Sequence, residues 1–226
     1  MTRVQTLLDI AKSAGLDAVA LIPGAHLQYL TGLDFHLSER PLVIFFTLTQ
    51  EPVAIAPALE ADRLAGCGFP IQIFPWSDTE GYQGAFAAAL DALQLDGKQL
   101  GIEELRMRVL EANTIQTYAP GAQIVSAGKT LAALRMHKDD AAIASMRQAI
   151  QISQDALEAL IPQIKPGMTE REVAGLLVVE QLKRGGGKHP FEPIVLSGPR
   201  SALPHGEPGD RQIALGEPLL FDFGTT

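Results

Sequence analysis

Apolar residues in the first 130 positions follow two patterns, helical spacing and short unbroken runs. Near-helical spacing extends to Gly15 and predicts a helix, and residues 17–22 are typical of a buried strand that ends at Pro23. Helices and strands continue to alternate along the chain. Further strands are expected at 42–46, 53–56, 71–74 (ended by Pro75), 100–102 and 124–125. Further helices are expected at 25–30, 59–64, 86–95 and 111–118. Because the strand runs are continuously apolar, we expect a mixed sheet flanked by helices on both faces. Residues 1–130 are therefore predicted to form an α/β domain.

A different pattern follows and predicts a second domain over residues 131–226. Asp139 suits the N-cap of a long helix whose apolar stripe is made by Ile143, Met146, Ile150, Leu157, Leu160 and Ile164. Pro162 is expected to kink or end this helix. Thr169 and Glu172 have the spacing of a capping box and begin a second helix, which is followed by three glycines. Short strands separated by turns are expected in the rest of the chain.

Composition narrows the classes of partner. A hydrophobic fraction of 46% and a charged fraction of 19% are typical of a soluble globular protein. The net charge of −8 provides no long-range positive field, so we expect neither nucleic acid nor an anionic membrane as a partner. The basic residues Lys183, Arg184 and Lys188 are interrupted by three glycines, which indicates a solvated turn rather than a binding patch.

Cysteine usage and the N-terminus indicate a cytoplasmic protein. The single cysteine, Cys67, cannot form a disulfide within the chain and has no adjacent His or carboxylate that would indicate a thiolate nucleophile. The N-terminus leads directly into an amphipathic pattern with Asp9 and Lys12, so we expect no signal or transit peptide. The apolar run over residues 42–48 is far shorter than the ~20 residues that a helical membrane crossing needs.

Asp222 follows the apolar run Leu219–Phe221 and precedes Phe223 and Gly224. Its carboxylate is therefore expected near a strand end, where it suits a metal ligand. By composition alone a capping or turn aspartate is the more frequent role for such a residue. Asp-Phe-Gly also occurs in protein kinases, but the Gly-rich loop, strand lysine and His-Arg-Asp loop of that class are absent from this sequence.

His205 lies between Pro204 and Gly206, a rigid residue and a permissive one, which is typical of a loop that presents an imidazole to a cleft. Such a histidine can bind substrate or shuttle a proton near neutral pH, although an exposed loop histidine explains the pattern equally well. The other histidines lack this framing. The sequence contains no His-Glu-x-x-His, paired cysteines or Gly-x-Ser-x-Gly, which disfavours zincins, zinc ribbons and α/β-hydrolases.

Several segments in the second half resemble the catalytic domain of Xaa-Pro peptidases, in the family's order and at about its spacing. They are residues 134–138, 141–149, 165–170, 191–198, 203–206, 208–211 and 222–224. Residues 17–20 and 29–33 are similar to the non-catalytic N-terminal domain of prolidases, aminopeptidases P and creatinases. Essentially the whole chain is covered by this resemblance.

The resemblance implies that an α/β domain precedes an α+β domain of the pita-bread type that holds two divalent cations. Manganese is the expected metal, with cobalt or zinc as alternatives. The implied reaction is hydrolysis of the peptide bond before proline by a hydroxide held between the two cations, which also polarise the scissile carbonyl. The resemblance makes His205 the histidine beside the scissile peptide, and it implies a homodimer that acts on proline-containing peptides.

Five metal ligands are usual in the family: two aspartates, a histidine and two glutamates. Asp222 matches the first aspartate, and the others follow later in the family than Thr226, the last residue here. The resemblance thus implies that the C-terminal part of the catalytic domain is missing. Because hard cations take around six ligands, we expect the 226-residue chain by itself to be inactive.

Three functions stay open at this point. The first is a metallopeptidase, either an aminopeptidase or a dipeptidase. The second is a metal-free, creatinase-type hydrolase, which Asp222 disfavours because a fold without metal has no need of that carboxylate. The third is a non-catalytic homologue that binds peptides or a protein partner.

Overall fold

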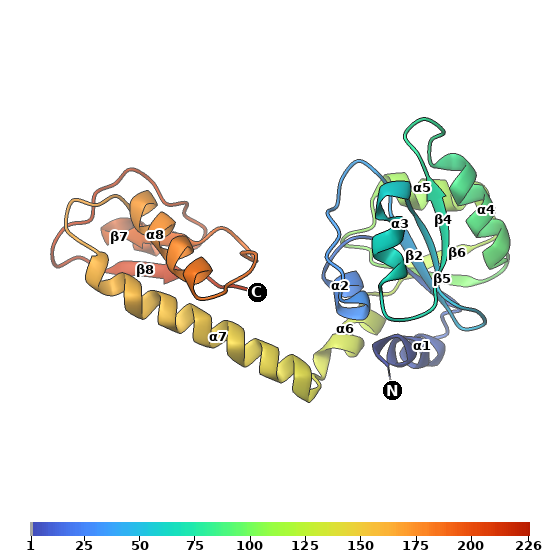
Figure 1. Ribbon diagram of the computed structural model, residues 1–226, viewed down its shortest axis with the longest axis horizontal. Helices are drawn as coiled ribbons and strands as arrows, with labels where there is room; N and C mark the ends of the chain where they lie inside the picture. Colours follow the sequence, from blue (N-terminus) through green and yellow to red (C-terminus); the bar gives the residue numbers. More distant parts are fainter. Residues whose placement is uncertain (1) are drawn as a thin grey trace. The chain divides into compact units, whose positions relative to one another are not determined.

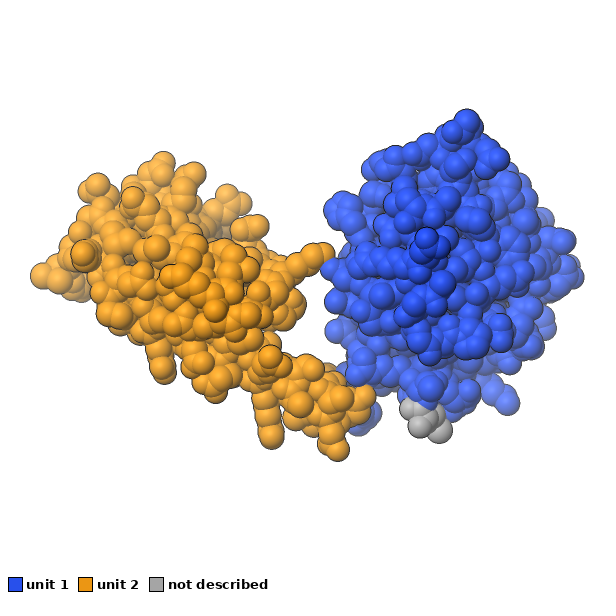
Figure 2. Space-filling model, viewed as in Figure 1, with its two compact units in different colours: residues 1–137 blue, residues 138–226 orange. Residues whose placement is uncertain are grey.

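The computed structural model describes residues 2–226, and the chain divides into two compact units, residues 1–137 and residues 138–226 (Figure 2). Each unit has its own apolar core. Within the described residues, no helix combines the length and hydropathy needed to cross a bilayer.

Unit 1 is built on a six-stranded sheet (Figure 1). Its strands are β1 (Ala18–Leu21), β2 (Val43–Thr47), β3 (Val53–Pro57), β4 (Gln72–Trp76), β5 (Gln99–Ile102) and β6 (Gln123–Ser126), in the order β4-β3-β2-β1-β5-β6. Strand β2 is antiparallel to both of its neighbours, β1 and β3. The other pairs are parallel, so the expected mixed sheet is confirmed.

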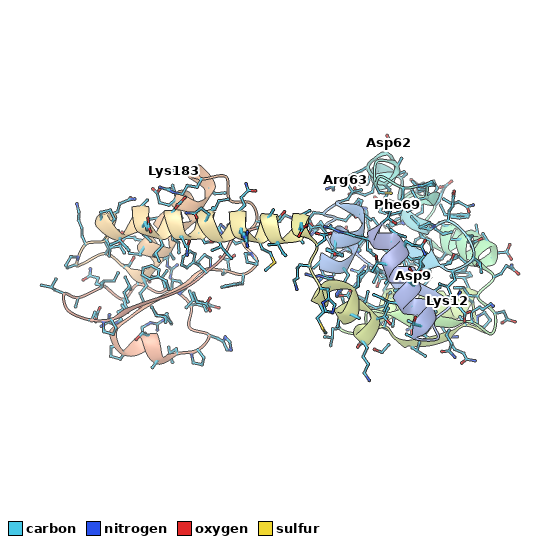
Figure 3. All side chains as sticks on the ribbon, turned by 90° about the horizontal axis from the view of Figure 1, so that it is seen from below. Asp9, Lys12, Asp62, Arg63, Phe69 and Lys183 are labelled. Carbon is cyan, nitrogen blue, oxygen red and sulfur yellow. The ribbon has the colours of Figure 1, made fainter. Side chains whose placement is uncertain are left out.

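Helices cover both faces of this sheet, as the continuous apolar runs predict. One core cluster joins the sheet to α1 (Arg3–Ser13), α2 (Ala25–Thr31), α3 (Ala58–Ala65) and α6 (Gly128–Met136). The other joins it to α4 (Gln83–Leu93) and α5 (Val109–Tyr118). Amphipathic α1 illustrates the arrangement, since Leu7 and Ala11 are buried while Asp9 and Lys12 are exposed (Figure 3).

The expectation that Pro75 ends its strand is wrong, because Pro75 lies inside β4 and faces Ala56 of β3. Strand β4 is at the edge of the sheet and pairs with β3 alone. A proline lacks the backbone N–H that a central strand needs for both neighbours, whereas an edge strand leaves one side unpaired. The sequence shows the proline but not the position of its strand in the sheet.

Unit 2 packs two helices against a two-stranded antiparallel sheet. The helices are α7 (Asp140–Leu160) and α8 (Glu170–Lys183), and the strands are β7 (Ile194–Ser197) and β8 (Leu219–Asp222). The carboxylate of Asp139 accepts a hydrogen bond from the Ala142 amide at 2.7 Å, which confirms the predicted N-cap. The capping box of α8 is also confirmed: the Thr169 amide donates to Glu172 at 2.7 Å, and the Glu172 amide donates to the Thr169 hydroxyl at 3.2 Å. Helix α7 gives way at Ile161–Gln163 to a 3₁₀ turn that contains Pro162.

The predicted apolar stripe of α7 is buried only in its second half. Ala156 and Leu160 belong to the core of unit 2, and Leu157 packs against it. In contrast, Ile143, Met146 and Ile150 are 38%, 50% and 55% exposed. Within the described residues, the predicted stripe is therefore covered only where α7 meets the core cluster of unit 2.

One buried ion pair ties α5 to the long connection between α2 and β2. Glu111 is fully buried, and its carboxylate accepts hydrogen bonds from the Arg108 guanidinium. The same guanidinium donates to the backbone carbonyl of Ser38. A buried carboxylate that loses its partner remains charged in an apolar setting, so this pair has a large effect on the stability of unit 1.

We expect Arg108→Met to lower the unfolding free energy of unit 1 by about 3 kcal/mol, because Glu111 loses its buried partner. Trp76, the only tryptophan, is buried in unit 1, so its fluorescence during denaturation reports on this unit. The matched control is Arg40→Met, which breaks an exposed pair with Asp78 and should leave the midpoint nearly unchanged. Equal effects of the two variants would contradict the assignment.

Candidate functional site

The two residues singled out from the sequence line one pocket of unit 2. Asp222 is the last residue of β8 and pairs in register with Ile194 of β7. His205 lies in a turn after the 3₁₀ segment Gly198–Ala202. Both side chains border a pocket of about 390 Å³, although both residues are exposed. The structure thus brings together an imidazole and a carboxylate that are separated by 17 positions in the sequence.

Two further carboxylates border the same pocket and were not assigned a role from the sequence. Glu192 follows Phe191 just before β7, and Glu207 comes two residues after His205. Glu192 and Glu207 also line a neighbouring pocket of about 500 Å³ against α8, together with Arg171. Each glutamate precedes a proline, which is the only local signal in the sequence, and such a signal does not distinguish a site from a turn.

The loop that carries His205, residues 198–208, is attached at both ends to one buried carboxylate. Glu170, the first residue of α8, is 0% exposed. It accepts hydrogen bonds from the Ser197 amide at 2.8 Å and from the Gly209 amide at 3.1 Å. The guanidinium of Arg200 also donates to it, at 3.1 Å. Burial alone would raise the pKa of Glu170, but the hydrogen bonds from Gly209 and Ser197 and the charge of Arg200 outweigh it and hold this pKa below its ordinary value.

A second ion pair lies beside Ser197 and Gly198, where the loop begins. The guanidinium of Arg211 donates to the two carboxylate oxygens of Glu217 at 2.6 Å each, and it also donates to the Ser197 hydroxyl at 2.5 Å. The Ala214 amide donates to Glu217 as well, at 2.7 Å. These bonds, with that from Arg211 first, lower the pKa of Glu217 to about 2. Gly198 lies against this pair in the left-handed region, at φ 52°, where a side chain would be strained.

Gly206 has a different role from the one expected. Its backbone is not in the left-handed region, so conformational freedom is not what this position needs. A Cβ at Gly206 would instead approach the buried side chain of Leu196 to 2.7 Å. Glycine therefore allows the turn beside His205 to lie directly on β7.

The backbone that follows Asp222 is held by the turn of three glycines. The Gly187 amide donates to the Thr226 carbonyl at 2.8 Å, and the Thr226 amide donates to the Lys188 carbonyl at 3.2 Å. The buried side chain of Gln181 donates to the Gly224 carbonyl at 3.0 Å. Close backbone approach explains Gly187, since a Cβ there would come within 2.8 Å of the Thr226 carbonyl, whereas Gly185 is in the left-handed region at φ 84°. Asp222 thus ends a strand that pairs with β7, and the backbone at Gly224 and Thr226 is hydrogen-bonded to α8 and to this turn.

Across residues 2–226, no group of three or more His, Cys, Asp or Glu side chains is arranged to hold a metal ion. Asp222 has the oxygen chemistry that hard divalent cations prefer, and its position at a strand end leaves the carboxylate accessible. It fits such a site as one ligand among several.

Comparison with known proteins covers both units. The creatinase/prolidase N-terminal domain matches residues 3–137, and metallopeptidase family M24 matches residues 144–226. An uncharacterized peptidase of Staphylococcus saprophyticus is 27% identical over 222 residues, which are 98% of this chain and 61% of that protein.

Two solved structures illustrate the similarity in fold. The prolidase from Thermococcus sibiricus has a TM-score of 0.89 and 28% identity over 99% of this chain and 60% of its own. The X-Pro aminopeptidase from Thermotoga maritima has a TM-score of 0.80 and 25% identity over 100% of this chain and 62% of its own. The chain therefore spans about 60% of the length of these proteins.

We expect unit 2 to lose stability as the pH falls from about 4.5 towards 2. Hydrogen bonds from Lys183, Arg184 and Gln163 lower the pKa of Glu180, on α8, to about 2. The pKa of Glu217 is also about 2 and that of Glu170 is lowered, so the folded state holds these groups ionised while the unfolded chain protonates them. The stabilisation is complete above the ordinary carboxyl pKa and disappears as the pH falls through the folded values. Denaturation midpoints followed by NMR of the Leu177 and Val195 methyl groups test this.

The variant Glu217→Gln should show a shallower loss of stability in that pH range, because it removes one of the depressed carboxyls. Glu192→Gln, at an exposed position of the same unit, is the matched control. A midpoint that does not change between pH 5 and pH 2 would contradict the expectation.

Proposed function

This chain belongs to the creatinase and prolidase family within metallopeptidase family M24, and we propose that it serves in hydrolysis of the peptide bond that precedes proline. One observation carries the proposal: Asp222, at a strand end, and His205, on a loop, border a single pocket. The similarity to a prolidase and to an X-Pro aminopeptidase over nearly the whole chain supports it. The first unit has the α/β fold of the N-terminal domain, and the second has the fold of the first part of a pita-bread domain.

Divalent metal ions are implied by the family, and we propose Asp222 as one ligand of a pair, with manganese the expected ion. When bound, two such ions would supply the Lewis acidity that polarises a scissile carbonyl. Among residues 2–226, no group of three or more His, Cys, Asp or Glu side chains is arranged to hold a metal ion, so Asp222 is the one ligand that we assign in this part of the chain. The pairing of β8 with β7 fixes the backbone that carries the Asp222 carboxylate.

The proposed role of His205 is to hydrogen-bond the substrate beside the scissile bond, or to hold or transfer a proton there. Its exposed imidazole lies at the pocket that Asp222 also borders. Glu192 and Glu207 give this pocket a negative rim, which favours a substrate with a free amino group nearby. Such a group is common to the substrates of a dipeptidase and of an aminopeptidase.

We also propose a homodimer in a reducing cytoplasm. Cys67, the only cysteine, is free and buried, which is compatible with that compartment. A non-catalytic peptide-binding role is the second candidate for the pocket that Asp222 and His205 border.

The proposed reaction predicts that the complete protein with manganese cleaves Xaa-Pro dipeptides or longer Xaa-Pro peptides, and that a chelator abolishes cleavage. His205→Asn should lower kcat by roughly 10²- to 10⁴-fold, because positioned acid–base groups contribute about that much. The matched control is His36→Asn, at an exposed position of unit 1, which should not change kcat. Cleavage that is unaffected by His205→Asn would rule out the role given to His205.

The 226-residue chain alone is expected to bind no pair of manganese ions tightly, because Asp222 is its single proposed ligand. Calorimetric titration of manganese into this chain provides the measurement, with Asp222→Asn as the control. Tight binding of two ions per chain would contradict the assignment of one ligand.

A further inference from the structure

We propose that Glu170 is a positioning residue that fixes the loop carrying His205. The inference rests on the role proposed for His205. Glu170 lies 35 positions before that histidine, on a different element, and makes no contact with the pocket that His205 borders. Its influence therefore passes through the backbone of the loop.

Each oxygen of the Glu170 carboxylate holds a different end of the loop. Oε1 accepts from the Ser197 amide at 2.8 Å and from the Ser197 hydroxyl at 2.9 Å, directly before the loop begins. Oε2 accepts from the Gly209 amide at 3.1 Å, directly after the loop ends. One rigid, planar group thus connects the two anchor points of residues 198–208, in addition to the pairing of Ser197 with Leu219 and the bond from the Arg171 amide to the Gly209 carbonyl.

Arg200 links the same carboxylate to the interior of the loop. Its Nε donates to Glu170 Oε2 at 3.1 Å, and its Nη2 donates to the Glu207 carbonyl at 2.7 Å. Glu207 is two residues beyond His205, so this bridge reaches the segment that presents the imidazole. The loop is therefore held at its start, at its end and close to the histidine.

The contacts point to positioning rather than to general packing. Glu170 is fully buried, and an apolar side chain would fill that space without the desolvation of a charge. Within the described residues, the four hydrogen bonds that its carboxylate accepts come from Ser197, Arg200 and Gly209, which bound or belong to the loop. Because a displacement of about 1 Å in a catalytic group can reduce a rate roughly 100-fold, control of this backbone matters for the proposed chemistry.

The variant Glu170→Gln tests the proposal with little change in volume. A glutamine has one acceptor oxygen and one NH₂ group, so it can satisfy the Ser197 end or the Gly209 end but not both. In the 226-residue chain, we expect amide hydrogen exchange of residues 198–209 to accelerate by about tenfold or more. Exchange at Val173 and Leu177, in the core of the same unit, should change less than about twofold.

The matched control is Glu172→Gln, the same substitution two residues along α8. A glutamine at this position can keep the capping box, and Glu172 has no hydrogen bond to the loop. Amide hydrogen exchange of residues 198–209 in Glu172→Gln should therefore match that of the wild type. A second variant, Arg200→Met, removes the bridge between Glu170 and the Glu207 carbonyl at a partly exposed side chain. It should accelerate amide hydrogen exchange around Glu207, and it tests the proposal even if Glu170→Gln fails to fold.

Exchange that is unchanged in both Glu170→Gln and Arg200→Met, or that rises equally throughout unit 2 in both variants, would overturn the proposal. In the complete protein, Glu170→Gln should lower kcat at least about tenfold with KM and metal content unchanged, while Glu172→Gln should not. A wild type that cleaves no Xaa-Pro peptide would contradict the proposed function, and the exchange measurement would still decide the role of Glu170.

Discussion

Burying a carboxylate away from water is tolerable only when every oxygen has donors, and unit 2 is organised around one such group. Glu170 gathers donors from the end of β7, from the 3₁₀ segment after it and from the chain before Arg211. These segments are irregular, and apolar packing alone does not determine the path of irregular backbone. The carboxylate therefore gives shape to a part of the fold that has little regular secondary structure of its own.

Further charged and polar side chains are hydrogen-bonded to the partners of Glu170. The Ser197 hydroxyl donates to Glu170 and accepts from Arg211, which in turn binds both oxygens of Glu217. The chain of charged and polar groups connects α8 to the segment that leads into β8. The network thus joins the start of the loop that carries His205 to the segment before β8, the strand that ends at Asp222.

Local patterns in the sequence predicted those elements whose cause is local. Asp139 and the pair Thr169 and Glu172 have the spacing of helix caps, and they act as caps in the structure. Features that depend on distant segments were not accessible in this way: the edge position that admits Pro75 and the exposure of Ile150 are set by which elements lie alongside.

The candidate site also contains residues with local sequence signals and residues whose role depends on distant segments. His205 and Asp222 were found because their own neighbours in sequence, and the resemblance that those neighbours carry, mark them. Glu170 lies in one of the resembling segments and at a helix start, but neither signal indicated its role, since its partners lie 27 and 39 positions away. Glu192 and Glu207 have no distinctive neighbours apart from prolines, and only the folded chain shows that they border the same pocket.

Strand β8 has one further consequence for handling the protein. Within the described residues it pairs with β7 alone, so one row of its backbone amides and carbonyls has no strand beside it. Leu220 on this strand is partly exposed, and an open, apolar edge is a template for pairing between molecules. Concentrated solutions of the 226-residue chain should therefore be prone to self-association and aggregation through β8.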